Sequence, residues 1–258
     1  MKWSNLRIGH RLGIGFLVVI LSMVLLTVLG VVRVEQISSR LSTINDLNSV
    51  KQRYAINFRG SVHDRAINLR DVVLAPTPAA AEPDIANIEK LAAKYADSAT
   101  KMDTMFTDAA AVSAKEKAAL TSIKGIEQKT LPLIDQVITL RKAGNEAQAL
   151  ELLMQQAKPA FIEWLAAINV FIDLEEAMNQ SESAQARSIA DGFLKTMLML
   201  CLLAIALAVA VGWQITRTVT RPLAEVVVVL SAVAEGDLPH DGAAGTEPVQ
   251  DRRHRQRG

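Results

Sequence analysis

The chain has 258 residues, 50% of them hydrophobic and only 4% aromatic, and its formal net charge at neutral pH is +1. This balanced charge argues against nucleic-acid binding, which usually needs a strongly basic surface. The apolar residues are concentrated in two long segments, which argues against a single ordinary globular domain.

Residues 12–32 form the first uncharged segment, bounded by Arg11 and Arg33. At about 1.5 Å per residue, a helix of this length crosses a hydrocarbon core of about 30 Å. A cleaved signal peptide is the alternative, because Lys2 and Arg7 also make the amino terminus basic. The apolar part is longer than in a signal peptide and lacks a small-residue cleavage pattern, so we predict a retained transmembrane helix.

Residues 33–195 show apolar residues at spacings of three and four, which predicts helix throughout. The first helix continues from the apolar segment and carries a regular coiled-coil-like seam. That seam consists of Leu41, Ile44, Asn48, Lys51, Ala55, Phe58, Val62, Arg65, Leu69 and Val72. Pro76 and Pro78 predict that the chain reverses there, and Pro83 suits the start of a second helix.

Two further helices are predicted from their start signals. Ser113 and Glu116 have the spacing of a capping box, which predicts a third helix to about Arg141. A turn at Gly144 then leads into a fourth helix that runs from about Glu146 into the second apolar segment. Two long and two shorter helices joined by short turns predict an up-down-up-down four-helix bundle.

Residues 196–216 form the second uncharged segment, followed by Arg217 and Arg221. Basic residues precede the first apolar segment and follow the second. By the positive-inside rule, we therefore expect both termini to be cytoplasmic and residues 33–195 to be periplasmic. The predicted fold is therefore an all-α protein of the bacterial inner membrane, with two transmembrane helices and a periplasmic bundle. The single cysteine, Cys201, lies in the second segment and excludes a disulfide within one chain.

Arg65 occupies a seam position where an apolar residue is expected. Counted from the distal turns, Arg65, Tyr95, Pro132 and Pro159 lie at one level of the bundle. A buried charge needs a partner, and an arginine can bind a carboxylate through two parallel hydrogen bonds. We expect a small carboxylate ligand there, although Arg65 could instead reach solvent or pair with an internal carboxylate.

The same counting places Lys51 and Glu175 at one height, each replacing an apolar residue in its helix, so we predict that they approach each other. His63 has no metal-ligating partner at helical spacing, and no nucleophile–base pair or phosphate loop is evident. We therefore expect no metal, no cofactor and no enzymatic activity.

Residues 217–238 include Thr220-Arg-Pro-Leu223 and Ala234-Glu-Gly-Asp-Leu238, which resemble the first helix and connector start of a HAMP domain. Residues 59–74 are similar to the first sensor helix of bacterial methyl-accepting chemotaxis receptors of the four-helix-bundle class. The resemblance implies a homodimeric sensor of a small molecule such as an organic acid or amino acid. By position, it implies that the anion is bound by Arg59, Arg65 and Arg70, with Tyr95, Thr130 and Trp164 as walls.

Residues 239–258 depart from that family, because they are rich in glycine and proline, end in several arginines and have no helical period. We expect this tail to be disordered, and we interpret it as the result of truncation or a frameshift within the HAMP domain. Kinase and adaptor coupling is then expected only for a full-length version. The sensor half of a histidine kinase and a purely structural membrane protein remain the alternatives.

Overall fold

The computed structural model describes residues 8–108, 112–220, 224, 226–228 and 230–231. It divides into two compact units, residues 1–26 with 198–258 and residues 27–197, which are described separately. No strand occurs among the described residues, so the all-α prediction is confirmed for them. The elements are α1 (Ile8–Ser42), η2 (Thr43–Asn48), α2 (Ser49–Leu74), η3 (Ala79–Ala81), α3 (Glu82–Met105), α4 (Ala114–Lys142), α5 (Glu146–Leu152), η4 (Leu153–Ala157), α6 (Lys158–Ile215) and η5 (Thr216–Thr220).

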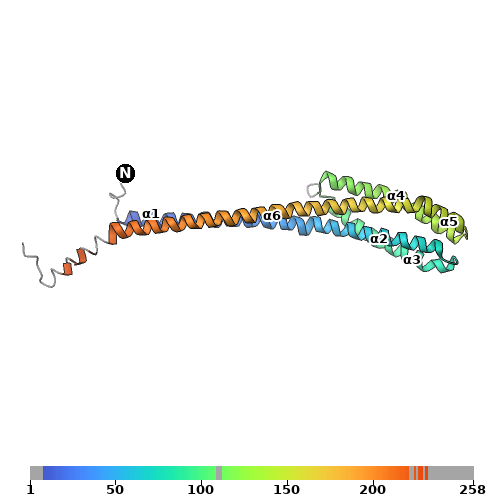
Figure 1. Ribbon diagram of the computed structural model, residues 1–258, viewed down its shortest axis with the longest axis horizontal. Coiled ribbons are helices and arrows are strands. Elements are labelled where there is room, and N and C mark those ends of the chain that lie inside the picture. Colours follow the sequence, from blue (N-terminus) through green and yellow to red (C-terminus); the bar gives the residue numbers. More distant parts are fainter. Residues whose placement is uncertain (1–7, 109–111, 221–223, 225, 229, 232–258) are drawn as a thin grey trace, which may run out of the picture. The chain divides into compact units, whose positions relative to one another are not determined.

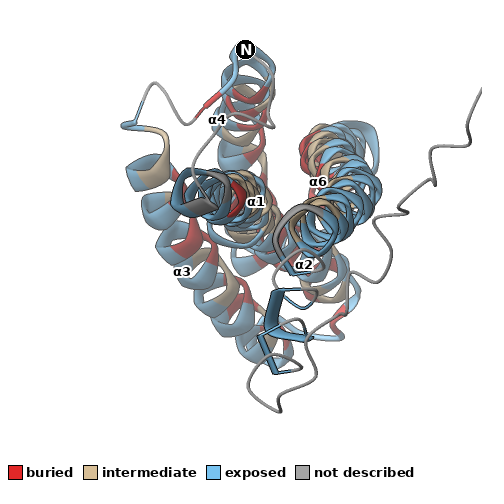
Figure 2. Ribbon diagram, turned by 90° about the vertical axis from the view of Figure 1, so that its left-hand side faces the viewer, coloured by how far each residue is buried: buried red, intermediate tan, exposed pale blue. Residues whose placement is uncertain are grey.

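In the unit of residues 27–197, four helical segments form the predicted bundle: α2, α3, α4 and the continuous α5–η4–α6 helix (Figure 1). Their inner faces enclose one apolar core, to which large side chains such as Phe58, Trp164 and Phe171 contribute. In Figure 2 the buried residues of these helices lie on the sides that face one another, and the outer sides are exposed.

The seam predicted for the first helix is confirmed over most of its length. From Asn48 to Val72 every seam residue is buried, including the polar Lys51 and the basic Arg65. Leu41 and Ile44 differ, since Leu41 is exposed and Ile44 is only half-buried. These two residues lie on the side of the first apolar segment, before the part of the helix that packs against α3 and α4. They therefore have fewer helices to pack against.

The distal turns form where proline and glycine predict them. α2 ends at Leu74, and Pro83 lies in the first turn of α3, where its missing N–H costs nothing. Gly144 adopts the left-handed conformation, with φ of 78°, between α4 and α5. Arg141 is buried and donates hydrogen bonds to the carbonyl groups of Val72 and Ala75, which satisfies the end of α2.

The capping box at the start of α4 is also confirmed. The backbone N–H of Glu116 donates to Ser113 Oγ at 3.2 Å, and the backbone N–H of Ser113 donates to Glu116 Oε2 at 2.6 Å. Two donors that an α-helix leaves free at its start are thereby satisfied.

Two π-helical segments, η2 and η4, were not predicted. η4 ends two residues before Pro159, whose ring cannot donate a hydrogen bond and would clash with the carbonyl four residues earlier. A wider turn at η4 relieves that clash without breaking the helix. Beside η2, the Thr43 hydroxyl donates to the carbonyl of Ser39 at 3.1 Å, a local bond that often bends helices.

In the unit of residues 1–26 and 198–258, α1 and α6 pack closely. A Cβ atom added at Gly15 would lie 2.7 Å from Val211 Cγ1, so glycine permits this approach. Within the described part of the chain, two helices are long and apolar enough to cross a membrane, and their apolar windows are almost wholly exposed, unlike a soluble core helix. Of the predicted HAMP segment at 217–238 only scattered residues are described, and the tail at 239–258 lies outside the described residues.

Candidate functional site

Arg65 lies inside the bundle, where it is only 2% exposed. Its guanidinium carbon is 5.1 Å from the centroid of the Tyr95 ring and 4.8 Å from that of the Trp164 ring. The two rings meet edge to face, with centroids 5.4 Å apart. Three of the predicted site residues therefore form one cluster. Cation–π attraction within it is strong, because the guanidinium is shielded from water.

Several donors of this cluster have no acceptor. Arg65 Nε, Arg65 Nη2 and Trp164 Nε1 are buried and lack a hydrogen-bond partner. The Tyr95 hydroxyl donates to Glu127 Oε2 at 3.2 Å. Burial lowers the pKa of Arg65 and raises the pKa of Glu127, and the attraction between the two groups opposes both shifts. Glu127, which was not predicted as a site residue, is thus a carboxylate that compensates the charge of Arg65.

Of the two alternatives considered for Arg65, the one in which it reaches solvent is wrong. The side chain does not reach solvent, because it is enclosed by the two aromatic rings. For the other, an internal carboxylate, Glu127 attracts Arg65, whereas the candidates Asp64, Asp71 and the exposed Glu163 form no ion pair with it. Asp64 and Asp71 lie on the outer face of α2 and contact His63 at 3.2 Å and Arg70 at 2.8 Å.

The other three predicted site residues do not join this cluster through any recorded contact. Thr130 is buried on α4, and its hydroxyl donates to the carbonyl of Ile126 in the same helix at 2.8 Å. Arg59 is exposed. Arg70 is exposed as well, but it lines a cavity on the side of the bundle. The six residues therefore do not surround one pocket, because residues spaced along a helix face different directions.

The cavity beside Arg70 has a volume of 490 Å³ and lies between α2 and the α5–η4–α6 helix. Its walls are mainly apolar: Ala66, Ile67, Leu153, Met154, Phe161, Ile162 and Leu165. Three basic side chains complete the lining: His63, Arg70 and Lys158. We call this space the α2–α6 cavity.

The basic residues of the α2–α6 cavity differ in how their charge is balanced. His63 and Arg70 each contact a neighbouring carboxylate on α2, whereas no ion pair to Lys158 occurs within the described part of the chain. An apolar wall with an unbalanced ammonium group at its rim suits an anion with an apolar body. Phe161 stacks on Trp164 with ring centroids 6.4 Å apart, which connects this cavity to the Arg65 cluster.

Lys158 and Phe161 were not predicted as site residues. The available signal was local: Lys158 precedes Pro159, and apolar residues follow it at positions 161, 162 and 165. The height of the site along the bundle was predicted well, because Pro159, next to Lys158, was placed at the level of Arg65. Height alone, however, does not tell which side chains face the cavity.

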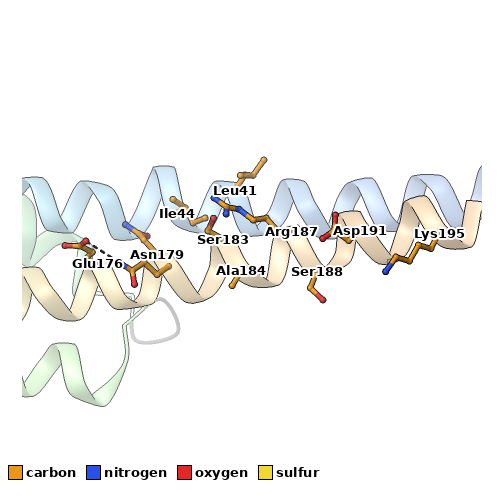
Figure 3. A pocket seen from close by; sticks show the side chains of 12 residues that line it. Leu41, Ile44, Glu176, Asn179, Ser183, Ala184, Arg187, Ser188, Asp191 and Lys195 are labelled. Carbon is orange, nitrogen blue, oxygen red and sulfur yellow. Dashed lines mark hydrogen bonds between the residues drawn. The ribbon is translucent and has the colours of Figure 1, made fainter.

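A second, polar groove of 1050 Å³ lies nearer the apolar segments, between α1–η2 and α6. Figure 3 shows Leu41 and Ile44 on one side and Arg187, Asp191 and Lys195 on α6. Arg40 and Glu182 join the two helices nearby, with 2.6 Å between Nη1 and Oε2. Among the described residues only α1–η2 and α6 border this groove, which leaves their apolar side chains incompletely covered.

The predicted approach of Lys51 and Glu175 is confirmed. Lys51 Nζ lies 3.7 Å from Glu175 Oε1 and is hydrogen-bonded to Glu116, a third member that was not predicted. All three side chains are buried, so a polar cluster joins α2, α4 and α6 inside the bundle.

Comparison with known families gives a match over most of the chain. A family model described as a four helix bundle sensory module for signal transduction matches residues 5–190. Searches of curated proteins and of solved structures gave no match.

Proposed function

The chain belongs to the four-helix-bundle sensory modules of methyl-accepting chemotaxis proteins. On that premise we propose that it is a membrane-anchored sensor whose helical bundle binds a small organic anion. The observation that carries the ligand class is the α2–α6 cavity, where apolar walls meet the unpaired Lys158. A monocarboxylate with an aromatic or short aliphatic body satisfies both features. Arg70 also lines the cavity and adds positive charge there.

The Arg65 cluster has a supporting role in this proposal. Its guanidinium is enclosed by Tyr95 and Trp164, so an anion reaches it only if the rings separate. Phe161 touches both the cavity and Trp164, and a ligand that moves Phe161 therefore acts on the cluster. The unsatisfied donors of Arg65 and Trp164 favour such a rearrangement, because a new acceptor would relieve their desolvation.

We further propose the membrane topology predicted from the basic flanks, with residues 33–195 periplasmic and both termini cytoplasmic. The two exposed apolar windows support insertion of both helices. In a Cys201→Ser background, a cysteine at Lys94 should react with an impermeant maleimide in intact spheroplasts. A cysteine at Arg7 should react only after lysis. The reverse pattern would refute this topology.

A homodimer is proposed from the groove shown in Figure 3. Two helices cannot cover both Leu41 and Ile44, but two copies side by side make four helices there. Cysteine substitution of Leu41 in the same background should give an intermolecular disulfide. The exposed Lys94 provides the control position, at which no crosslink is expected.

Signal output is proposed to travel through α6, which continues from the bundle without interruption to Ile215. A HAMP domain after that helix would receive the displacement. The sensor half of a histidine kinase has the same plan, so the two outputs differ only in the domain that follows. A full-length version expressed in a receptorless chemotactic strain distinguishes them, because only a chemoreceptor should change swimming bias with the ligand.

Thermal unfolding of the full chain in detergent tests ligand binding directly. Benzoate and hexanoate should raise the midpoint in a concentration-dependent way, and succinate and aspartate should raise it less. The absence of any shift with the apolar carboxylates would refute the assigned ligand class.

A further inference from the structure

A layer of buried polar residues crosses the bundle near the end that leads to the apolar segments. Lys51 is 1% exposed, and Glu116 and Glu175 are wholly buried. One turn away, Asn179 donates to Ser49 Oγ at 3.3 Å. The layer joins α2, α4 and α6, and the proposed ligand site does not use it.

Glu116 is held in this layer as an anion. It accepts hydrogen bonds from Lys51 Nζ and from the backbone N–H of Ser113, and it lies in the first turn of α4, where the helix dipole favours negative charge. Burial alone would raise the pKa of Glu116, but the bonds from Lys51 and Ser113 outweigh it and hold the pKa below its ordinary value. The charge of Lys51 is therefore already balanced by Glu116.

Glu175 has no such support. Among the described residues no donor reaches either of its carboxyl oxygens, and the 3.7 Å between Oε1 and Lys51 Nζ is too long for a hydrogen bond. As a protonated acid, Glu175 can hydrogen-bond by donating to Glu116. Burial and the neighbouring carboxyl group of Glu116 raise the pKa of Glu175 to about 8, against the opposing effect of Lys51. Near neutral pH the layer thus holds one cation, one anion and one protonated acid.

The charged groups that face Glu175 come from two elements, Lys51 on α2 and Glu116 on α4. The segment after α3 supplies an apolar cover: the Phe106 ring lies 6.2 Å, between centroids, from the ring of Phe171, one turn before Glu175. The acidic neighbours of Glu175 on α6 itself are exposed to solvent. Loss of the Glu175 proton is therefore not compensated by another cation in the layer.

We propose that Glu175 is a proton-binding site through which the position of α6 depends on the pH around the bundle. When Glu175 ionises, two carboxylates face one ammonium group in a buried layer. Repulsion from Glu116 and the cost of burying the extra charge favour a shift of α6 that lets water reach Glu175. Because α6 continues as one helix to Ile215, the shift is passed toward the apolar segment. This input is independent of the α2–α6 cavity.

Infrared difference spectroscopy of the full chain in lipid nanodiscs tests the proton site. A protonated-carboxyl band should disappear with a midpoint near pH 8 as the pH is raised. Glu175→Gln should abolish that band, and its amide should preserve the packing because it mimics the protonated acid. Glu176→Gln, an exposed neighbour, should leave it unchanged. A band that persists in Glu175→Gln would overturn the assignment.

Pulsed electron resonance tests the movement. Spin labels at Arg53→Cys on α2 and Gln180→Cys on α6, both exposed positions, are introduced in a Cys201→Ser background. The distance distribution should shift between pH 6.5 and 9, a range chosen to bracket the midpoint of about 8, and Glu175→Gln should keep it at its low-pH form. An unchanged distribution in the otherwise wild-type chain would refute the switch even if Glu175 titrates.

Discussion

Arg65 and Trp164 lie face to face inside the bundle, with the guanidinium carbon 4.8 Å from the ring centroid, and both carry buried nitrogen atoms without acceptors. A full positive charge is thus held mainly by aromatic faces and by the more distant Glu127. Such an arrangement gives less stability than a hydrogen-bonded ion pair, which leads to the first prediction.

Arg65→Met should change the free energy of unfolding by less than about 1 kcal/mol or raise it, because it removes a desolvated charge and keeps the volume. Trp164→Ala should lower the same quantity by about 3–5 kcal/mol, since it empties the centre of the core. Urea unfolding of the full chain, followed by circular dichroism, measures both. A loss above about 3 kcal/mol for Arg65→Met would mean that Arg65 has acceptors in solution.

Lys51→Met should lower the free energy of unfolding by about 3–5 kcal/mol, because it leaves Glu116 buried without its cation. Glu175→Leu should change it much less, since the removed group is an uncharged acid that accepts no hydrogen bond from the described residues. Combined with Lys51→Met, the second substitution should cost a different amount than it does alone. Strict additivity in this double-mutant cycle would show that the two residues do not interact.

The free energy of unfolding should depend on pH through the titration of Glu175. The pKa of Glu175 is about 8 in the folded chain and ordinary in the unfolded chain, so the folded state binds more protons between these values. The contribution of Glu175 to the free energy of unfolding is therefore complete below its ordinary pKa of about 4.3 and falls by up to about 1.4 kcal/mol per unit as the pH rises toward the folded pKa.

Chemical unfolding at intervals from pH 5 to pH 8 measures this slope, and Glu175→Gln should reduce it, leaving the part that Glu127, whose pKa is also raised, contributes. The pKa of Glu116 is lowered instead, so its contribution to stability is lost only on acidification. Glu116 therefore adds no slope between pH 5 and pH 8. A free energy that rises across the window would contradict the assigned protonation of Glu175.

Ser113→Ala should lower the free energy of unfolding by about 1 kcal/mol, because it removes one bond of the capping box at the start of α4. Ser113→Asp should retain most of the stability, since aspartate also accepts at this position. No loss for alanine would show that the cap contributes nothing.

The helices and turns could be predicted because local signals mark them. Pro83, Gly144 and the Ser113–Glu116 pair each leave a short-range signature, and the seam from Asn48 to Val72 follows one helical period. Counting along the helices also paired Lys51 with Glu175, because helical rise is nearly constant.

The site was predicted less completely because it depends on the direction of each side chain. Arg59, Arg65 and Arg70 lie on one helix, yet the first is exposed, the second is buried and the third lines the cavity. Lys158 follows a π-helical segment that shifts the facing of α6, and the sequence pattern contains no reliable sign of that shift.

Isothermal titration of the full chain in detergent with benzoate tests the central claim, that the α2–α6 cavity of this sensory module binds an apolar carboxylate. Benzoate should bind the wild-type chain, and Lys158→Met should weaken binding at least tenfold, about 1.4 kcal/mol. Arg59→Met, at an exposed arginine away from the cavity, should bind like the wild type. No heat of binding, or equal affinity for wild type and Lys158→Met, would contradict the account.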